Sequence, residues 1–187
     1  MKHILTLVLI LGLYSCGSSQ TIIDIAQESF PGDSKNGQYY HKDINGYFDD
    51  FVGTWKYEYD TNKEFRITFV KVEMYHDTED GFDYYYDGLI LTYQKYENGN
   101  LVYQSPADNF PDGLSKEQGK LWISFTDYGR DEADFGLDLT LQNQVIGGGS
   151  NQLHFKLDNA HRENPYHIAN PNEPYYSVPD DMIMTKM

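Results

Sequence analysis

The feature that most constrains the fold of this chain is a period of two in its apolar residues. Apolar side chains occupy every second position from Trp55 to Tyr59 and again from Phe65 to Phe69. This spacing puts them on one face of an extended strand, whereas one face of a helix needs a period near 3.6. No useful length of the chain after Phe51 has the helical period. The pattern therefore predicts an all-β fold.

Eight segments share this strand-like character and follow one another along the chain. Asn98-Gly99 separates two of them and is the strongest short signal for a hairpin. Because hairpins join neighbouring strands in antiparallel order, we expect an antiparallel up-and-down meander of about eight strands. Closing this meander into a barrel would remove its exposed edges. The expected strands are residues 54–59, 65–74, 84–96, 101–104, 121–126, 135–141, 153–157 and 181–186.

The second expected strand changes the parity of its apolar positions. Phe69 is followed by Val70, and the apolar residues then continue at Val72 and Met74. One extra residue in a strand causes such a change, because it turns the following side chains to the other face. We therefore expect a β-bulge or a strand bend at Phe69-Val70.

Residues 1–16 have the organisation of a lipoprotein signal peptide. A charged start precedes an apolar run from Ile4 to Tyr14, which is shorter than the roughly 20 residues of a membrane-spanning helix. The sequence Leu13-Tyr14-Ser15-Cys16 resembles a bacterial lipobox. This resemblance implies cleavage before Cys16, acylation of Cys16 and a lipid anchor in the cell envelope, with the outer membrane as the expected location. The alternative is ordinary signal-peptide cleavage near Ser19-Gln20.

Two further segments lack a clear strand pattern. We expect residues 17–50 to form a tether or N-terminal extension, in which Ile22 to Phe30 either stays free or packs on the domain. Residues 51–187 then form a single barrel domain. Within it, the connection from Asp158 to Asp180 contains four prolines. A connection of this length is either mobile or simply packed on the domain, or it is a lid over a ligand.

Composition excludes several classes of partner. The chain has 29 Asp and Glu residues against 14 Lys and Arg residues, for a net charge of -15. Because it has little means of neutralising phosphates, we expect no binding of nucleic acid. Cys16 is the single cysteine, which excludes an internal disulfide and a metal site with several cysteines.

The sequence also predicts no metal site, no cofactor and no catalysis. Acidic residues 77–83 do not match the twelve-residue calcium loop and are expected in a solvated connection. His154, His161 and His167 are spaced too irregularly for a zinc site. The chain lacks the common nucleophile, zinc-protease and phosphate-binding motifs. We therefore expect a non-enzymatic protein.

Tyrosine is the most unusual residue in the composition, with 17 copies. Several tyrosines fall on adjacent expected strands, where they should become cross-strand neighbours. They suit half-buried strands under a polar surface, the wall of a ligand pocket, or an exposed platform for sugars. The tyrosines concerned are Tyr84, Tyr85, Tyr86, Tyr93, Tyr96 and Tyr103.

The start of the expected barrel resembles that of the lipocalin and calycin proteins. Gly53 and Trp55 match their Gly-x-Trp motif, and the resemblance implies that Lys186 packs over the Trp55 ring to close the barrel. From Phe51 onward the chain is also similar to an uncharacterised family of small, β-rich, secreted or lipid-anchored proteins of Bacteroidota, including Tyr85 to Ile90. These resemblances imply a lipocalin-like barrel at the envelope and assign no activity.

We expect this barrel to bind a small, at least partly apolar ligand inside it. One face of the first strands carries the apolar side chains that such a cavity needs. The competing hypotheses are a surface module that binds sugars or proteins through exposed Tyr, Asp and Asn side chains, and a purely structural lipoprotein with a filled barrel. The expected ligand-lining residues are Trp55, Tyr57, Phe65, Ile67, Phe69, Leu89, Leu91 and Tyr93.

Overall fold

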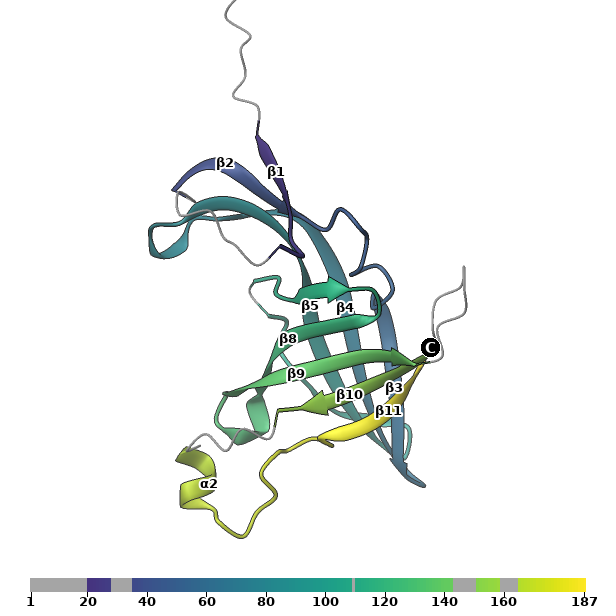
Figure 1. Ribbon diagram of the computed structural model, residues 1–187. Coiled ribbons are helices and arrows are strands. Elements are labelled where there is room, and N and C mark those ends of the chain that lie inside the picture. The colour runs from purple at the N-terminus through teal and green to yellow at the C-terminus, as the bar shows by residue number, and fades with distance from the viewer. Residues whose placement is uncertain (1–19, 28–34, 109, 143–150, 159–164) are drawn as a thin grey trace, which may run out of the picture.

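The computed structural model (Figure 1) describes residues 20–27, 35–108, 110–142, 151–158 and 165–187. The chain is all-β, as predicted, and these residues form one sheet of 11 strands in the order β1-β2-β5-β4-β3-β11-β10-β9-β8-β7, with β6 paired to β5 outside this path. Its strands are β1 (Thr21–Asp24), β2 (Lys35–Lys42), β3 (Gly53–Asp60), β4 (Lys63–Asp77), β5 (Asp83–Glu97), β6 (Asn100–Gln104), β7 (Leu114–Glu117), β8 (Lys120–Asp127), β9 (Ala133–Gln142), β10 (Gln152–Leu157) and β11 (Asp181–Lys186). Its short helices are η1 (Glu79–Gly81), η2 (Tyr128–Arg130) and α2 (Pro165–Ala169).

The predicted meander is present from β3 to β11. Each of the eight expected strands has a counterpart, and the neighbours in this part pair antiparallel. At the β5–β6 hairpin, Asn98 and Gly99 have φ angles of 51° and 75°, the positive values that a tight two-residue turn requires. The last strand returns to the first of the meander, with Lys186 opposite Trp55.

The predicted purely antiparallel arrangement is wrong, and the predicted closed barrel is not confirmed. The sheet is mixed, because β2 runs parallel to both β1 and β5. The sheet is also not closed, since β5 and β8 do not pair within the described residues. The outer edge of β5 instead forms hydrogen bonds with β2 and β6. In addition, Leu89 pairs with Asp112 and Tyr93 with Ser105. These partners occupy the backbone groups that would otherwise pair with β8.

The sequence did not predict β1, β2 and β7. β1 and β7 have four residues each, and β2 is a polar segment that contains Gly37. Residues 35–50 are therefore not a free tether, since Phe48 is buried in the core and β2 pairs with β5. Residues 21–24 pair with β2 as β1, so the described part of the segment from Ile22 to Phe30 packs on the domain and does not stay free.

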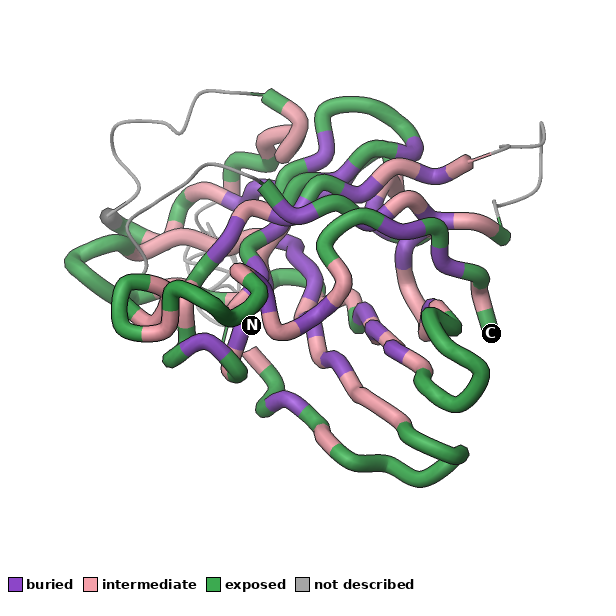
Figure 2. Tube along the Cα trace, turned by 90° about the horizontal axis from the view of Figure 1, so that it is seen from below, coloured by how far each residue is buried: buried purple, intermediate pink, exposed green. Residues whose placement is uncertain are grey.

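Aromatic and aliphatic side chains fill the space enclosed by the meander. Buried residues alternate with more exposed ones along the strands, as Figure 2 shows. The Phe65 ring lies 5.7 Å from that of Tyr93 and 5.8 Å from that of Phe155. The Phe125 ring lies 5.1 Å from Tyr93. These rings come from β4, β5, β8 and β10, so the two walls of the meander meet through a common core.

The β-bulge lies further along β4 than predicted. The pairing of β4 with β5 is regular through Val72, and its register shifts between Val72 and Tyr75. Phe69 keeps the inward parity and Val70 is 54% exposed. The change of apolar parity at Val70 therefore does not reflect an inserted residue. Val70 faces outward in a regular part of the strand, where a β-branched side chain is also favourable.

A buried carboxylate holds the bulge in place. Asp87 is 1% exposed and accepts hydrogen bonds from the Tyr40 hydroxyl at 2.5 Å and the Asp43 N–H at 2.9 Å. It also accepts from the N–H of Met74, the bulge residue with a φ of 56°, at 2.9 Å. Asp87 thus joins the N-terminal extension to the point where β4 becomes irregular.

Candidate binding site at the sheet seam

The candidate site lies between β5 and β8, where strand pairing stops. Residues 105–113, which we call the seam segment, connect these two edges, and the structure describes all of them except residue 109. The backbone of Asp112 pairs with that of Leu89 in β5 at 2.7 and 2.9 Å. The Asp112 carboxylate accepts the N–H of Ser124 in β8 at 2.8 Å. The seam segment therefore joins two edges that do not pair directly.

Gly88 allows the seam segment to approach β5 closely. A Cβ at Gly88 would lie 2.9 Å from the Cβ of Pro111, 3.0 Å from its carbonyl carbon and 3.1 Å from the nitrogen of Asp112. The Tyr86 hydroxyl donates to the Pro111 carbonyl at 2.9 Å. A side chain at Gly88 would push the seam segment away from β5, so this glycine is needed for contact and not for an unusual φ.

A cavity of about 560 Å³, here called the tyrosine pocket, opens beside the seam segment. The rings of Tyr84 and Tyr86 lie 5.6 Å apart in its wall, and the His41 ring meets Tyr84 edge-on at 5.7 Å. The other lining residues come from the turn after β1, the seam segment and β7. They are Ile25, Gln27, Pro111, Asp112, Gly113, Leu114 and Lys116.

A second cavity of about 480 Å³, the acidic pocket, adjoins the first. The two pockets share Tyr86, Pro111 and Asp112. The remaining lining residues of the acidic pocket are carboxylates, hydroxyl-bearing side chains and aromatic rings. They are Asp108, Phe110, Ser124, Thr126, Tyr128 and Asp134.

Each carboxylate of the acidic pocket uses only one of its oxygens in hydrogen bonds with other described residues. Asp108 accepts the Leu91 N–H at 3.2 Å, and Asp134 accepts the Thr126 hydroxyl at 2.7 Å. Asp112 accepts from Ser124, as described above. Across the described ranges, no further donor reaches the second oxygen of any of the three. The pocket therefore gathers three hydrogen-bond acceptors in one cavity.

Burial changes the titration of several lining side chains. It raises the pKa of Asp108 from 3.8 to about 6; the Leu91 hydrogen bond lowers this pKa, and the charges of Asp112 and Asp134 raise it further. Burial raises the pKa of Tyr84 to about 12, with a further contribution from Asp77. Burial lowers the pKa of His41. At neutral pH, His41 is therefore mainly uncharged and Tyr84 keeps its proton.

The residues predicted to line a ligand cavity lie elsewhere. All except the half-buried Tyr57 are at most 3% exposed and pack in the core, and none lines either pocket. The tyrosine clusters divide between these regions, since Tyr93 is a core residue whereas Tyr84 and Tyr86 form a pocket wall. The predicted set in the core is Trp55, Tyr57, Phe65, Ile67, Phe69, Leu89, Leu91 and Tyr93.

The residues of the Gly-x-Trp motif lie together with Lys186. The Lys186 ammonium is 5.1 Å from the centroid of the Trp55 ring and donates to the Asp50 carbonyl at 3.2 Å. Trp55 is entirely buried, and its indole N–H donates to the Phe51 carbonyl at 2.8 Å. Gly53 has a φ of 114°, and a Cβ there would lie 3.5 Å from Cε of Lys186. Lys186 therefore lies against the Trp55 ring, whereas the lipocalin-like character of this start stays a prediction.

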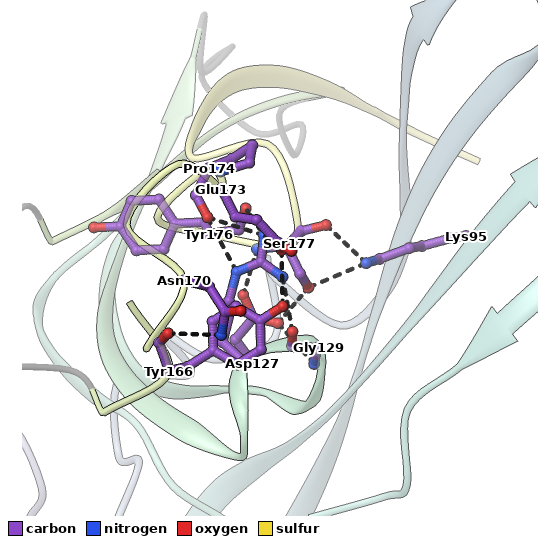
Figure 3. Close-up of polar contacts among 10 residues, drawn as sticks. Lys95, Asp127, Gly129, Tyr166, Asn170, Glu173, Pro174, Tyr176 and Ser177 are labelled. Atoms are coloured by element: carbon purple, nitrogen blue, oxygen red, sulfur yellow. Dashed lines mark hydrogen bonds and ion pairs between the residues drawn. The ribbon is translucent and has the colours of Figure 1, made fainter. Parts of the chain in front are cut away.

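A second polar cluster, drawn in Figure 3, fixes the connection before β11. Asp127 is fully buried and accepts hydrogen bonds from the N–H of Ser177 at 2.7 Å, the Ser177 hydroxyl, and the N–H of Gly129 at 3.0 Å. Lys95 donates to the Ser177 carbonyl at 2.8 Å and to its hydroxyl at 3.1 Å. The hydroxyl of Ser177 is thus committed to Asp127 and Lys95, which gives this cluster a structural role.

Arg130 extends the same cluster along the connection. Its guanidinium donates to the Pro174 carbonyl at 3.1 and 2.9 Å and to the Tyr176 carbonyl at 3.3 Å. It also lies 4.7 Å from the centroid of the Tyr166 ring. Residues 165–180 line neither pocket. Of the alternatives for this connection, the described part fits a segment that is packed on the domain, and not a lid over these pockets.

Sequence reasoning missed the carboxylates of the acidic pocket. The signal that could have revealed Asp108 and Asp112 is the separator between β6 and β8, which is longer than a hairpin loop and contains Pro106 and Pro111. Asp134 gave no such signal, because it is one of several acidic residues around a turn.

The described residues contain no group of three or more His, Cys, Asp or Glu residues that could hold a metal ion. They also contain no helix long and apolar enough to cross a membrane. His154 instead pairs with Asp181 at 2.7 Å. Cys16, the predicted signal peptide and His161 lie outside the described residues.

Comparison with known proteins gives a family without an assigned activity. Residues 1–114 match the Family of unknown function (DUF6705), which agrees with the predicted uncharacterised family. No curated protein and no solved structure matches the chain. The match covers more than half of the chain and includes residues 1–16, β1 to β6 and the whole seam segment. The chain therefore belongs to the Family of unknown function (DUF6705).

Proposed function

We propose that this protein is a lipid-anchored envelope protein that binds a neutral carbohydrate at the seam and catalyses no reaction. The observation that carries the proposal is the acidic pocket, in which three carboxylates each keep one oxygen without a partner among the described residues. Aromatic rings line the same cavity. This combination is the one that the surface-module hypothesis requires.

The lining chemistry matches the two kinds of surface on a sugar. Sugar hydroxyls donate hydrogen bonds, and bonds to ionised acceptors are about twice as strong as those between neutral groups. The C–H faces of a sugar ring are apolar and can lie against an aromatic ring. Phe110 is 44% exposed at the acidic pocket, and Tyr128 lines it as well. A sugar could therefore contact carboxylates and rings at the same time.

The size of the two pockets favours a ligand longer than one sugar ring. Cavities of about 560 and 480 Å³ are each within the usual range of small-molecule sites, which is roughly 300–1,000 Å³. Because they share Tyr86, Pro111 and Asp112, one ligand could extend through both. An oligosaccharide would then contact the carboxylates at one end and the Tyr84–Tyr86 wall at the other.

Charge favours a ligand without anionic groups. The chain has a net charge of -15, and Asp108, Asp112 and Asp134 line one cavity. A carboxylate or phosphate on the ligand would meet like charges there, which costs binding free energy. An apolar ligand inside the sheet is a weaker proposal, because the predicted lining residues belong to the hydrophobic core and none of them lines either pocket.

The lipid anchor rests on Cys16 and its lipobox-like sequence. Two or three acyl chains on one terminus are enough for stable attachment to a membrane. Cys16→Ala should therefore release the protein from the membrane fraction and abolish its labelling by palmitate. Tyr14→Ala, which leaves the cysteine in place, is the matched control and should change neither result. A Cys16→Ala protein that stays in membranes and still takes up label would contradict the anchor.

Binding is tested by titration calorimetry of the full chain carrying Cys16→Ala, which leaves every described residue unchanged. The probes are chitotriose, cellotriose and maltotriose, with a fatty acid as the apolar comparison. We expect saturable binding of at least one trisaccharide. Asp112→Asn and Asp134→Asn should each weaken it about tenfold or more, because a hydrogen bond to a charged group is worth roughly 1.5–3 kcal/mol.

Asp181→Asn is the control for these variants, since this exposed carboxylate pairs with His154 and lines neither pocket. It should bind the trisaccharide as well as the parent chain does. The asparagine at position 112 can still accept from Ser124, so a loss of binding there need not reflect unfolding. Binding of the fatty acid alone, hydrolysis of a bound trisaccharide, or unchanged binding by both pocket variants would overturn the proposal.

A further inference from the structure

The wall of the tyrosine pocket includes the residues that directly follow β1. Ile25 and Gln27 line the pocket. β1 pairs with β2 in parallel from Thr21 opposite Tyr39 to Asp24 opposite Lys42. The N–H of Ile25 then donates to the Lys42 carbonyl at 3.0 Å. This part of the pocket is therefore held by backbone bonds to the sheet.

Side-chain bonds of Asp24 also hold the turn after β1. Asp24 accepts the N–H of Ala26 at 3.0 Å with one oxygen and the side-chain amide of Asn45 at 3.0 Å with the other. The turn is thus tied both to itself and to the segment after β2. These hydrogen bonds therefore couple the position of β1 to that of Ile25 and Gln27 in the pocket wall.

The same segment leads directly to the proposed anchor. Ile25 is nine positions after Cys16, so their Cα atoms are at most about 30 Å apart, even when the chain is fully extended. In Figure 1, β1 begins at the upper end of the molecule and leads toward the body of the sheet. An acylated Cys16 would therefore keep the tyrosine pocket within about 30 Å of its attachment point at the membrane.

We infer that the carbohydrate bound at the seam is the uncharged glycan headgroup of a lipid in the membrane that holds the protein. The inference rests on the proposed function. A short tether confines the pocket to a thin layer above the membrane, where a lipid-linked sugar has a high effective concentration. The carboxylates of the acidic pocket select against phosphate-bearing and other anionic headgroups, which leaves a neutral glycan.

The test compares the same sugar in free and lipid-linked form. The acylated full-length protein is placed in phosphatidylcholine vesicles that contain chitotriose, cellotriose or maltotriose linked to diacylglycerol. Binding is followed by the protection of seam-segment amides from hydrogen exchange. For the trisaccharide that binds in solution, we expect the lipid-linked form to bind about tenfold or more tightly than the free form at equal total concentration.

Two spacer variants test whether the short tether causes this preference. A rigid helical spacer of about 20 residues between Ser19 and Gln20 adds roughly 30 Å and should remove most of the preference for the lipid-linked sugar. A flexible Gly/Ser spacer of equal length should reduce the preference less, because it can fold back toward the membrane. Both variants should bind the free trisaccharide like the parent protein.

The outcomes separate this inference from the proposed function. Equal affinity for the free and the lipid-linked sugar would rule out a membrane lipid as the source of the sugar. A preference that the rigid spacer leaves unchanged would do the same. Neither result would contradict the sugar site itself. Tighter binding of a diacylglycerol-linked trisaccharide that carries a carboxylate also overturns the inference. Failure of every trisaccharide to bind in either form overturns the proposed function itself.

Discussion

The connection before β11 and the seam segment are each attached to β8 through an aspartate. The two aspartates differ in how many hydrogen bonds their carboxylates accept. Asp127 at the end of β8 accepts three hydrogen bonds, from both the N–H and the hydroxyl of Ser177 and from Gly129. Asp112 in the seam segment accepts a single bond from Ser124 of β8. Asp127 is fully buried, whereas Asp112 lines both pockets. A fully bonded carboxylate fixes a connection, and a partly bonded one beside a cavity can also bind a ligand.

The surroundings of the two aspartates strengthen this contrast. Lys95 and Arg130 lie in the cluster around Asp127, and burial lowers the pKa of Lys95. The carboxylates nearest to Asp112 in the acidic pocket are Asp108 and Asp134, and the pocket's lining includes no cation. With Glu173, which lies 3.9 Å from the Arg130 guanidinium, the first cluster has two carboxylates and two cations without a ligand. The second concentrates negative charge, which makes it the better place for hydroxyl donors.

The largest expected effect comes from removing the carboxylate of Asp127. Asp127→Ala should lower the free energy of unfolding by about 3 kcal/mol, because it leaves several buried donors without an acceptor. Urea unfolding followed by circular dichroism measures this loss. Asp181→Ala is the matched control and should cost less than about 1 kcal/mol, since its carboxylate is exposed. Equal losses for the two variants would contradict the structural role of Asp127.

The next effect concerns the contact between the seam segment and β5. Gly88→Ala should lower the free energy of unfolding by about 2 kcal/mol, because the new Cβ would overlap Pro111 and Asp112. It should also abolish the titration signal with the trisaccharide, because both pockets depend on the position of Pro111 and Asp112. Asp127→Ala, in contrast, should retain trisaccharide binding at temperatures where it is folded. A Gly88→Ala protein with full binding would show that the site does not depend on the seam.

Much of the sheet could be predicted from the sequence, because its strands depend on local patterns. Apolar residues with a period of two located the strands from β3 to β11 except β7, and Asn98-Gly99 located a hairpin. β2 could not be found in this way, since its pairing depends on β5 and on the hydrogen bonds of Asp87. The parity change at Val70 was misread because an exposed apolar residue resembles the effect of a bulge.

The candidate site was harder to predict than the strands. The residues expected to line a ligand have the pattern of a hydrophobic core and lie in one, since sequence parity alone does not distinguish core residues from the lining of a cavity. Asp108 and Asp134 meet only because the seam segment fills the gap between β5 and β8. That gap arises from long-range pairing, which no local pattern encodes. Tyr84 and Tyr86 were recognised as candidates, but their neighbours were not.

The smallest expected effect is a pH dependence at Asp108, the carboxylate of the acidic pocket whose pKa is raised to about 6. Its charged form is disfavoured in the folded protein, so the cost is present above about pH 6 and disappears as the pH falls toward 4. Asp108→Asn should therefore stabilise the protein by about 1 kcal/mol at neutral pH and by nothing near pH 4, because solvent screens part of the cost. Urea unfolding of both proteins across this range measures the difference. Trisaccharide binding should change in the opposite direction, weakening in the parent protein as Asp108 takes up its proton, since a protonated carboxyl is a poorer acceptor. A stabilisation by Asp108→Asn that stayed the same down to pH 4, or trisaccharide binding that did not change over this range, would contradict this prediction.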